Sequence, residues 1–346
     1  MFASASPAAG PDPWSDDGPP AGFPPPRTGP GLDDLVGPRK RRGPRRFRPG
    51  GPSARRPEDE ADDDELDEEE IEPVEINKPL SLTIAGFAVL LGLGLVLAAQ
   101  TSGPSHRLPF ATVVFGVQLL FVLAWTMATR PPALLAVAGV GAATAGVVDT
   151  VAVRSAEARL LPLLYVAVGG LVVAVLGQLV RRVDRQRVTD SFGTTLLIMA
   201  GVAGFATLLP LSRIPAGTQT ITVSLTATAL ALTVARITDA VLPWPRLAPQ
   251  VPRGAAGVVL GAMLGTLAGS VLGSFLVGFT PTSGALVGLV TAATAVLADL
   301  AVGYAEAGRL MAGETPTFWI ARHMQGPLGG IALAAPAAYF VCVLFL

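Results

Sequence analysis

The sequence predicts an all-α integral membrane protein, a polytopic bundle of about nine transmembrane helices that follows a disordered N-terminal tail. The chain of 346 residues is 51% hydrophobic and only 15% charged, whereas soluble domains carry about 25% charged residues. Long apolar segments follow one another from residue 79 onward, and most acidic residues lie before them. We therefore divide the chain into a tail, residues 1–77, and a transmembrane domain, residues 78–346.

The tail has the composition of a disordered segment. Residues 1–77 hold 15 of the 31 prolines and few large apolar side chains, so they cannot bury enough surface to offset the entropy of ordering the chain. Nine basic side chains lie in residues 39–56 and thirteen acidic ones in residues 58–75. Two interpretations stay open: a polybasic segment that contacts anionic lipid, and a solubilising polyampholyte. Nucleic-acid binding is not expected, since aromatic side chains are hardly interleaved with the arginines.

Each predicted span has about 20 mostly apolar residues, the length that crosses the hydrocarbon core. The spans are residues 79–100, 109–128, 132–150, 160–180, 192–212, 218–236, 254–277, 282–303 and 327–346. In the sixth span, Thr220, Thr222 and Ser224 alternate with apolar residues as they would in a strand. A lone strand leaves its backbone unsatisfied in lipid, so we expect a helix whose hydroxyls bond to its own carbonyls or to neighbours.

The arginines in the short loops predict the orientation of the bundle. With the N-terminus inside, the inner loops carry ten arginines and the outer loops carry four. This asymmetry predicts a cytoplasmic N-terminus and an external C-terminus. Arginine outnumbers lysine 23 to 2, which is typical of a GC-rich bacterial genome, so the predicted location is a bacterial plasma membrane.

The seventh span carries glycines at every fourth position. Glycines at this spacing form a smooth ridge along one face of a helix, where a second backbone can approach closely. Tight helix packing is the expected role, and a groove along the ridge is the alternative. The ridge consists of Gly257, Gly261, Gly265, Gly269 and Gly273.

Three stretches in the last third of the chain share a resemblance. They are PRLAPQVPRGAAGVVLGAMLGTLAG (245–269), LVGLVTAATAVLADLAVGYAEAGRL (286–310) and GPLGGIALAAPAAYFVCVLFL (326–346). This part of the chain, residues 245–346, resembles the phosphatidate cytidylyltransferase (CDP-diacylglycerol synthase) family. The resemblance implies phospholipid metabolism, in which CMP passes from CTP to phosphatidate. Such a transfer needs a divalent metal such as Mg²⁺ held by carboxylates, and cations against the phosphates.

The sequence departs from the family's pattern where that chemistry resides. Asp299 matches the family's aspartate, but Val302 and Gly303 replace the Glu-Ser that follows it. Leu328 occupies the position of the family's histidine, and no acidic residue occurs after Glu314 to supply the final Asp-Arg-x-Asp. We interpret the chain as a non-catalytic relative, a pseudoenzyme for which no cofactor is expected. Asp299 is the best candidate for a catalytic or metal-binding residue if the enzyme is active.

A carboxylate within a span is a functional-site hypothesis by default. Asp299 either joins a hydrogen-bond network, with the hydroxyls of the sixth span or with Arg253, or it binds a cation or a proton. One cysteine, Cys342, and two histidines, His106 and His323, make a disulfide within the chain impossible and a Cys/His zinc site unexpected.

Three functions follow from these observations. The leading hypothesis is a non-catalytic membrane protein that binds an anionic lipid or modulates a membrane-protein partner. The second is an active cytidylyltransferase with a rearranged site at the inner face, formed by Asp239, Arg246, Arg253, Asp299, Glu306 and Glu314. The third is a transporter of a small solute or an ion. Contacts to lipid or phosphate are expected at Arg246, Arg253, Arg322 and His323.

Overall fold

The computed structural model describes residue 74 and residues 76–102, 107–155, 157–180, 188–314 and 317–346. The predicted disordered tail and its two charge blocks lie outside the described residues, apart from the few positions next to the first helix. The four arginines between residues 181 and 187, which contribute to the predicted orientation, also lie outside them.

Within the described residues, nine helices are long and apolar enough to cross a membrane, which confirms the predicted class. They are α1 (Lys78–Thr101), α2 (Leu108–Thr129), α3 (Leu134–Arg154), α4 (Leu161–Val180), α5 (Val188–Ala206) continued by α6 (Leu208–Leu211), α7 (Gly217–Val241), α8 (Ala255–Gly273), α9 (Pro281–Met311) and α10 (Trp319–Phe345). A short hairpin, β1 (Arg246–Ala248) and β2 (Val251–Gly254), connects α7 to α8.

Local chemistry explains where several helices begin and end. The Asn77 side chain accepts a hydrogen bond from the backbone N–H of Leu80 and caps α1. Pro210 has no N–H to donate to the carbonyl of Ala206, so the fifth span is divided into α5 and α6. The last helix begins at Trp319 rather than at residue 327, although it contains two prolines. Neighbouring helices make such prolines tolerable inside a membrane bundle.

The sixth predicted span is the helix α7, as expected, and its hydroxyls bond to its own backbone. Thr220 Oγ1 donates to the carbonyl of Ala216 at 2.9 Å, and Thr222 Oγ1 donates to that of Thr218 at 2.9 Å. The alternation of polar and apolar residues therefore produces no strand here. In lipid, the helix satisfies every backbone group internally and leaves the hydroxyls to bond locally.

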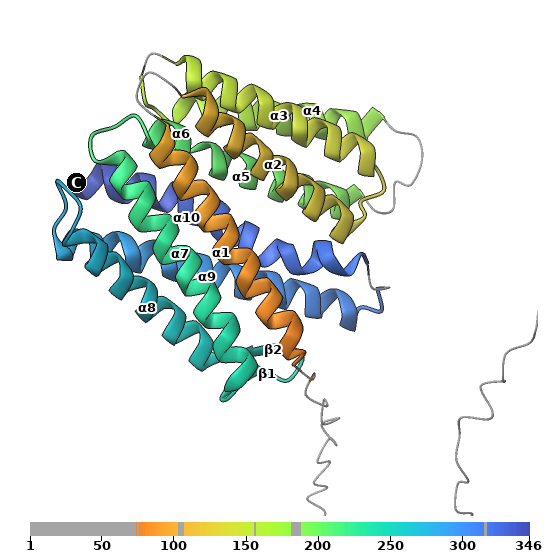
Figure 1. Ribbon diagram of the computed structural model, residues 1–346. Helices are drawn as coiled ribbons and strands as arrows, with labels where there is room; N and C mark the ends of the chain where they lie inside the picture. Colours follow the sequence, from red (N-terminus) through yellow and green to blue (C-terminus); the bar gives the residue numbers. More distant parts are fainter. Residues whose placement is uncertain (1–73, 75, 103–106, 156, 181–187, 315–316) are drawn as a thin grey trace, which may run out of the picture. The chain divides into compact units, whose positions relative to one another are not determined.

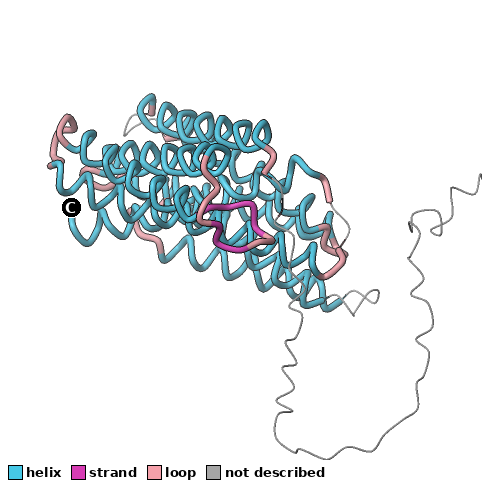
Figure 2. The backbone as a smooth tube through the Cα atoms, turned by 90° about the horizontal axis from the view of Figure 1, so that it is seen from below, coloured by secondary structure: helices cyan, strands magenta, loops and turns pink. Residues whose placement is uncertain are grey.

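The helices form two sets that α10 joins (Figure 1). One set contains α2, α3, α4 and α5, which contact one another, and the other contains α1, α7, α8 and α9. Helix α10 packs against α7 and α9 on one side and against α2 and α5 on the other. The hairpin packs on the ends of α7, α8 and α9, and Figure 2 shows it as a small antiparallel pair among the helices. We call this end of the bundle the hairpin end.

Helix α8 buries only the glycine ridge predicted from its sequence. A Cβ at Gly261 would lie 2.6 Å from the carbonyl oxygen of Ala231 in α7, and one at Gly265 would lie 2.5 Å from the Cβ of Ala292 in α9. The ridge therefore lies directly against two neighbouring backbones, which no larger residue would permit.

This packing predicts opposite effects for two glycine-to-alanine changes. Gly261→Ala should destabilise the protein by about 1–3 kcal/mol, because its Cβ meets backbone that cannot move away cheaply. Gly94→Ala in α1 meets nothing within 4 Å and should be neutral or stabilising by up to about 1 kcal/mol. Thermal unfolding of both variants in the same detergent measures the difference, and equal stabilities would contradict the packing described here.

Candidate functional site: a buried ion cluster and an amphipathic groove

Four charged side chains meet at the hairpin end and form what we call the ion cluster. Arg236 and Asp239 lie near the end of α7, Arg253 lies on β2, and Asp299 lies in α9. Arg253 donates from Nη1 to Asp239 Oδ2 at 2.8 Å and from Nη2 to Asp299 Oδ2. Arg236 donates from Nη2 to the other oxygen of Asp299. The backbone N–H of Gly254 donates to Asp239 Oδ1 at 2.9 Å.

The ion cluster is almost fully buried, and its charges balance. The side chains of Asp299, Asp239 and Arg253 are 0%, 2% and 4% exposed. Burial alone would lower the pKa of Arg253, but the carboxylates of Asp299 and Asp239 outweigh it and raise that pKa above its ordinary value. The two arginines and the two aspartates bond to one another, and their formal charges sum to zero. Removing any one of them would leave an uncompensated charge in a dry interior.

Two glycines make room for the carboxylates. A Cβ at Gly257, the first glycine of the ridge, would lie 2.6 Å from Asp239 Oδ1. A Cβ at Gly326 in α10 would overlap the carboxylate of Asp299. Gly257 and Gly326 therefore have a structural role beside the ion cluster, in addition to the packing between helices.

The network around Asp299 includes the expected contact with Arg253 and lacks the expected contact with the hydroxyls of α7. Arg236 and Asp239 complete it. Asp239 was expected near Asp299 only in the rearranged site, and Arg236 was not singled out as a partner. Their spacing of three residues on one helix places them on one face, which is the signal that could have identified them.

A polar cavity of about 260 Å³ lies beside the ion cluster, between α1, the hairpin, α9 and α10. Arg236, Arg253, Arg322 and His323 line it. The arginine charges have partners within the chain, since Arg322 bonds to Glu306 just as Arg236 and Arg253 bond to the aspartates. The predicted lipid contacts of Arg253, Arg322 and His323 therefore stay predictions.

Arg246 lies apart from the polar cavity. It is on β1, where Nη1 donates to the carbonyl of Val74 at 2.9 Å. The backbone N–H of Val74 donates in turn to the carbonyl of Pro249 at 3.1 Å, which holds the segment before α1 against the hairpin. The contact of Arg246 with lipid or phosphate also stays a prediction.

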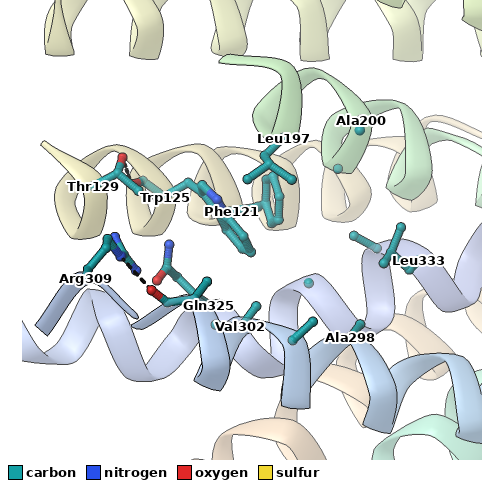
Figure 3. Close-up of a pocket in the computed structure, with 15 residues that line it drawn as sticks. Phe121, Trp125, Thr129, Leu197, Ala200, Ala298, Val302, Arg309, Gln325 and Leu333 are labelled. Atoms are coloured by element: carbon teal, nitrogen blue, oxygen red, sulfur yellow. Dashed lines mark hydrogen bonds between the residues drawn. The ribbon is translucent and has the colours of Figure 1, made fainter. Parts of the chain in front are cut away.

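A second cavity of about 420 Å³ opens between the two helix sets and is amphipathic (Figure 3). Helices α2, α5, α9 and α10 form its walls. Apolar and small side chains cover most of its length, and Thr129, Arg309 and Gln325 gather at one end (Figure 3). We call it the groove, and it is lined by Phe121, Trp125, Thr129, Leu197, Ala200, Gly201, Ala298, Ala301, Val302, Ala305, Arg309, Gln325, Gly329, Ala332 and Leu333.

The polar end of the groove holds hydrogen-bonding capacity that the protein itself does not use. Arg309 is the one cation of the lining, and within the described residues no carboxylate lies at ion-pair distance from it. It donates only weakly, to the carbonyls of Ala305 and Ala128 at 3.4 Å. Gln325 is 2% exposed, and its Oε1 has no hydrogen-bond partner within the described ranges. A cation and a buried acceptor thus face one end of an apolar channel.

The groove could not be predicted from the sequence, because it forms only where α2 and α5 meet α9 and α10. Arg309 is one of the ten inner-loop arginines that predict the orientation. In comparisons with known proteins, no family model matches the chain and no curated protein matches it.

Because the charges of the ion cluster balance, we expect that removing one arginine together with one aspartate destabilises the protein less than removing one aspartate alone. Asp299→Leu should cost about 3–5 kcal/mol, because it leaves two arginines against one aspartate. Arg236→Met together with Asp299→Leu removes one charge of each sign and should recover part of that loss. Denaturation in detergent measures both variants, with Glu157→Gln, which breaks an exposed pair with Arg159, as the near-neutral control. A double variant no more stable than Asp299→Leu would contradict this account.

Proposed function

We propose that this multi-pass membrane protein is a non-catalytic relative of the phosphatidate cytidylyltransferases that binds an anionic phospholipid in the groove. The observation that carries the proposal is the amphipathic lining: a long apolar channel that ends at Arg309, a cation with no carboxylate partner among the described residues. An acyl chain fits the apolar length, and a phosphate fits the cation. The role is binding or modulation of a membrane partner, as the sequence suggested.

The polar end of the groove favours a head group that carries both a phosphate and a hydroxyl. Arg309 would bind the phosphate as a charged donor. The unpartnered Oε1 of Gln325 is an acceptor, so it calls for a donor such as a head-group hydroxyl. A glycerol head group supplies that donor, which makes phosphatidylglycerol the lipid of choice for a test. By the predicted orientation, this end of the groove faces the cytoplasmic leaflet of a bacterial plasma membrane.

The ion pairs of Asp239 and Asp299 with arginines support the proposal that the protein is not catalytic. Metal-dependent nucleotide transfer uses carboxylate oxygens that are free to bind the metal. Asp299 and Asp239 instead accept hydrogen bonds from arginines, and both are buried. An active enzyme with a rearranged site would have to break these ion pairs before metal could bind.

The groove predicts a head-group preference that depends on Arg309. Arg309→Gln should weaken phosphatidylglycerol binding about fivefold, because a basic side chain at the membrane surface contributes roughly 1 kcal/mol. Phosphatidylcholine binding should change little, since its head group has no net charge. Lipid titration followed by native mass spectrometry measures both. An unchanged ratio of the two affinities in Arg309→Gln would overturn the head-group assignment.

The apolar length of the groove is tested by filling it. Ala301→Trp places a large ring in the groove and removes the space for the acyl chain. It should therefore weaken the binding of phosphatidylglycerol and phosphatidylcholine to a similar degree. Leu289→Trp is the matched control, since Leu289 is on the same helix, is 48% exposed and lies outside the groove. Equal binding by the two tryptophan variants would place the lipid elsewhere.

The non-catalytic proposal predicts that the purified protein forms no liponucleotide from radiolabelled CTP and phosphatidate in the presence of Mg²⁺. The reason is that Asp239 and Asp299 are already bound to arginines. Product formation that Asp299→Asn abolishes, in a variant whose unfolding temperature shows that it still folds, would establish an active cytidylyltransferase instead.

A further inference from the structure

A second buried aspartate lies in the other helix set, and its surroundings differ from those of the ion cluster. Asp149 is on α3, about one turn before the helix ends, and is 5% exposed. Gln118 of α2 is fully buried and donates from Nε2 to Asp149 Oδ1 at 3.0 Å and to the carbonyl of Val202 in α5 at 3.1 Å. One amide thus connects α2, α3 and α5.

This arrangement leaves acceptors without donors. The two bonds of Nε2 fix the orientation of the amide, because both partners are acceptors and neither can bond to Gln118 Oε1. Asp149 Oδ2 and Gln118 Oε1 are both buried and have no hydrogen-bond partner among the described residues. An extra donor hydrogen is therefore what this site lacks.

Asp149 has no cationic partner in the part of the chain that the structure describes, whereas Asp299 contacts two arginines. Of the helices that pack on α3, α2 contributes only the neutral Gln118, and α4, α5 and α6 place no described charged side chain in the cavity beside Asp149. Arg154, on α3 itself, lines that cavity without contacting the carboxylate. An ionised carboxylate held this way would be costly in a membrane bundle.

We propose that Asp149 is a proton-binding site. A hydronium ion from the aqueous phase transfers its proton to Oδ2, which forms the neutral carboxylic acid and leaves water. Oδ1 keeps its bond from Gln118. The proton removes the charge that the bundle does not compensate, and it supplies a donor at the oxygen that has no partner.

A cavity of about 340 Å³ between α2 and α3 provides the path for the proton. Thr112, Phe115, Thr150 and Asp149 itself are among the residues that line it. The hydroxyls of Thr112 and Thr150 can support water in the cavity, and Asp149 is its acid. Loss of the proton would leave an unpaired anion where α2, α3 and α5 meet, so proton release favours opening of that contact.

Two measurements on the full chain in liposomes test the proposal. Dicyclohexylcarbodiimide modifies protonated carboxyls in apolar surroundings, so peptide mass spectrometry should find the adduct on Asp149 at neutral pH and not on Asp299 or the exposed Glu157. Infrared spectroscopy should detect the carbonyl band of a protonated carboxyl at neutral pH, sensitive to deuterium oxide, which Asp149→Asn removes and Glu157→Gln does not. Asp149→Asn should unfold at the wild-type temperature, because it replaces one neutral group by another.

Three results would overturn the proposal. An infrared band that persists in Asp149→Asn, or the absence of both the band and the adduct, would overturn the proposal. A large loss of stability in Asp149→Asn would also overturn it, since an ionised and compensated carboxylate behaves in that way. None of these outcomes bears on lipid binding in the groove, which is measured independently.

Discussion

The double ion pair of Arg253 is the interaction on which the hairpin end depends. One guanidinium bonds to Asp239 of α7 and to Asp299 of α9, while its own strand connects α7 to α8. The hairpin therefore places the Arg253 guanidinium between the buried carboxylates of Asp239 and Asp299. Because Asp239, Arg253 and Asp299 are buried and the charges of the ion cluster balance, the ends of the helices and the hairpin can separate only if charges lose their partners.

This constraint fixes the two faces that α9 presents near its end. Asp299, Glu306 and Leu310 face the ion cluster or the polar cavity. Ala298, Ala305 and Arg309 recur at helical spacing on an adjacent face and line the groove. Val302 lies between the two faces and lines both cavities. The pairs that hold α9 toward α7 thus leave a neighbouring face of α9 to line the groove with α2, α5 and α10.

The sequence predicted the elements of this fold better than its sites. Lipid requires about 20 apolar residues per span, so the helices could be placed from hydropathy, and the glycine spacing marked the close face of α8. The contact between Asp299 and Arg253 was one of the open alternatives. Asp239 was expected near Asp299 only in the rearranged site. Arg236 was missed as a partner because its pair with Asp299 depends on how α7 packs against α9. Asp149 was missed because the third span was placed to end beside it, whereas α3 continues to Arg154.

Asp149 and Asp299 both place a carboxyl group in an apolar helix, which costs free energy in a membrane. Their hydrogen-bond and ion-pair partners differ, and so does their chemistry. Two arginines contact Asp299, so a change of its charge would leave them without a partner there. A single neutral amide holds Asp149, so its charge can change by one proton without the loss of any ion pair. A change in the charge of Asp149 would therefore act on the α2 and α5 walls of the groove. The ion pairs of Asp299 hold α9, which forms another wall.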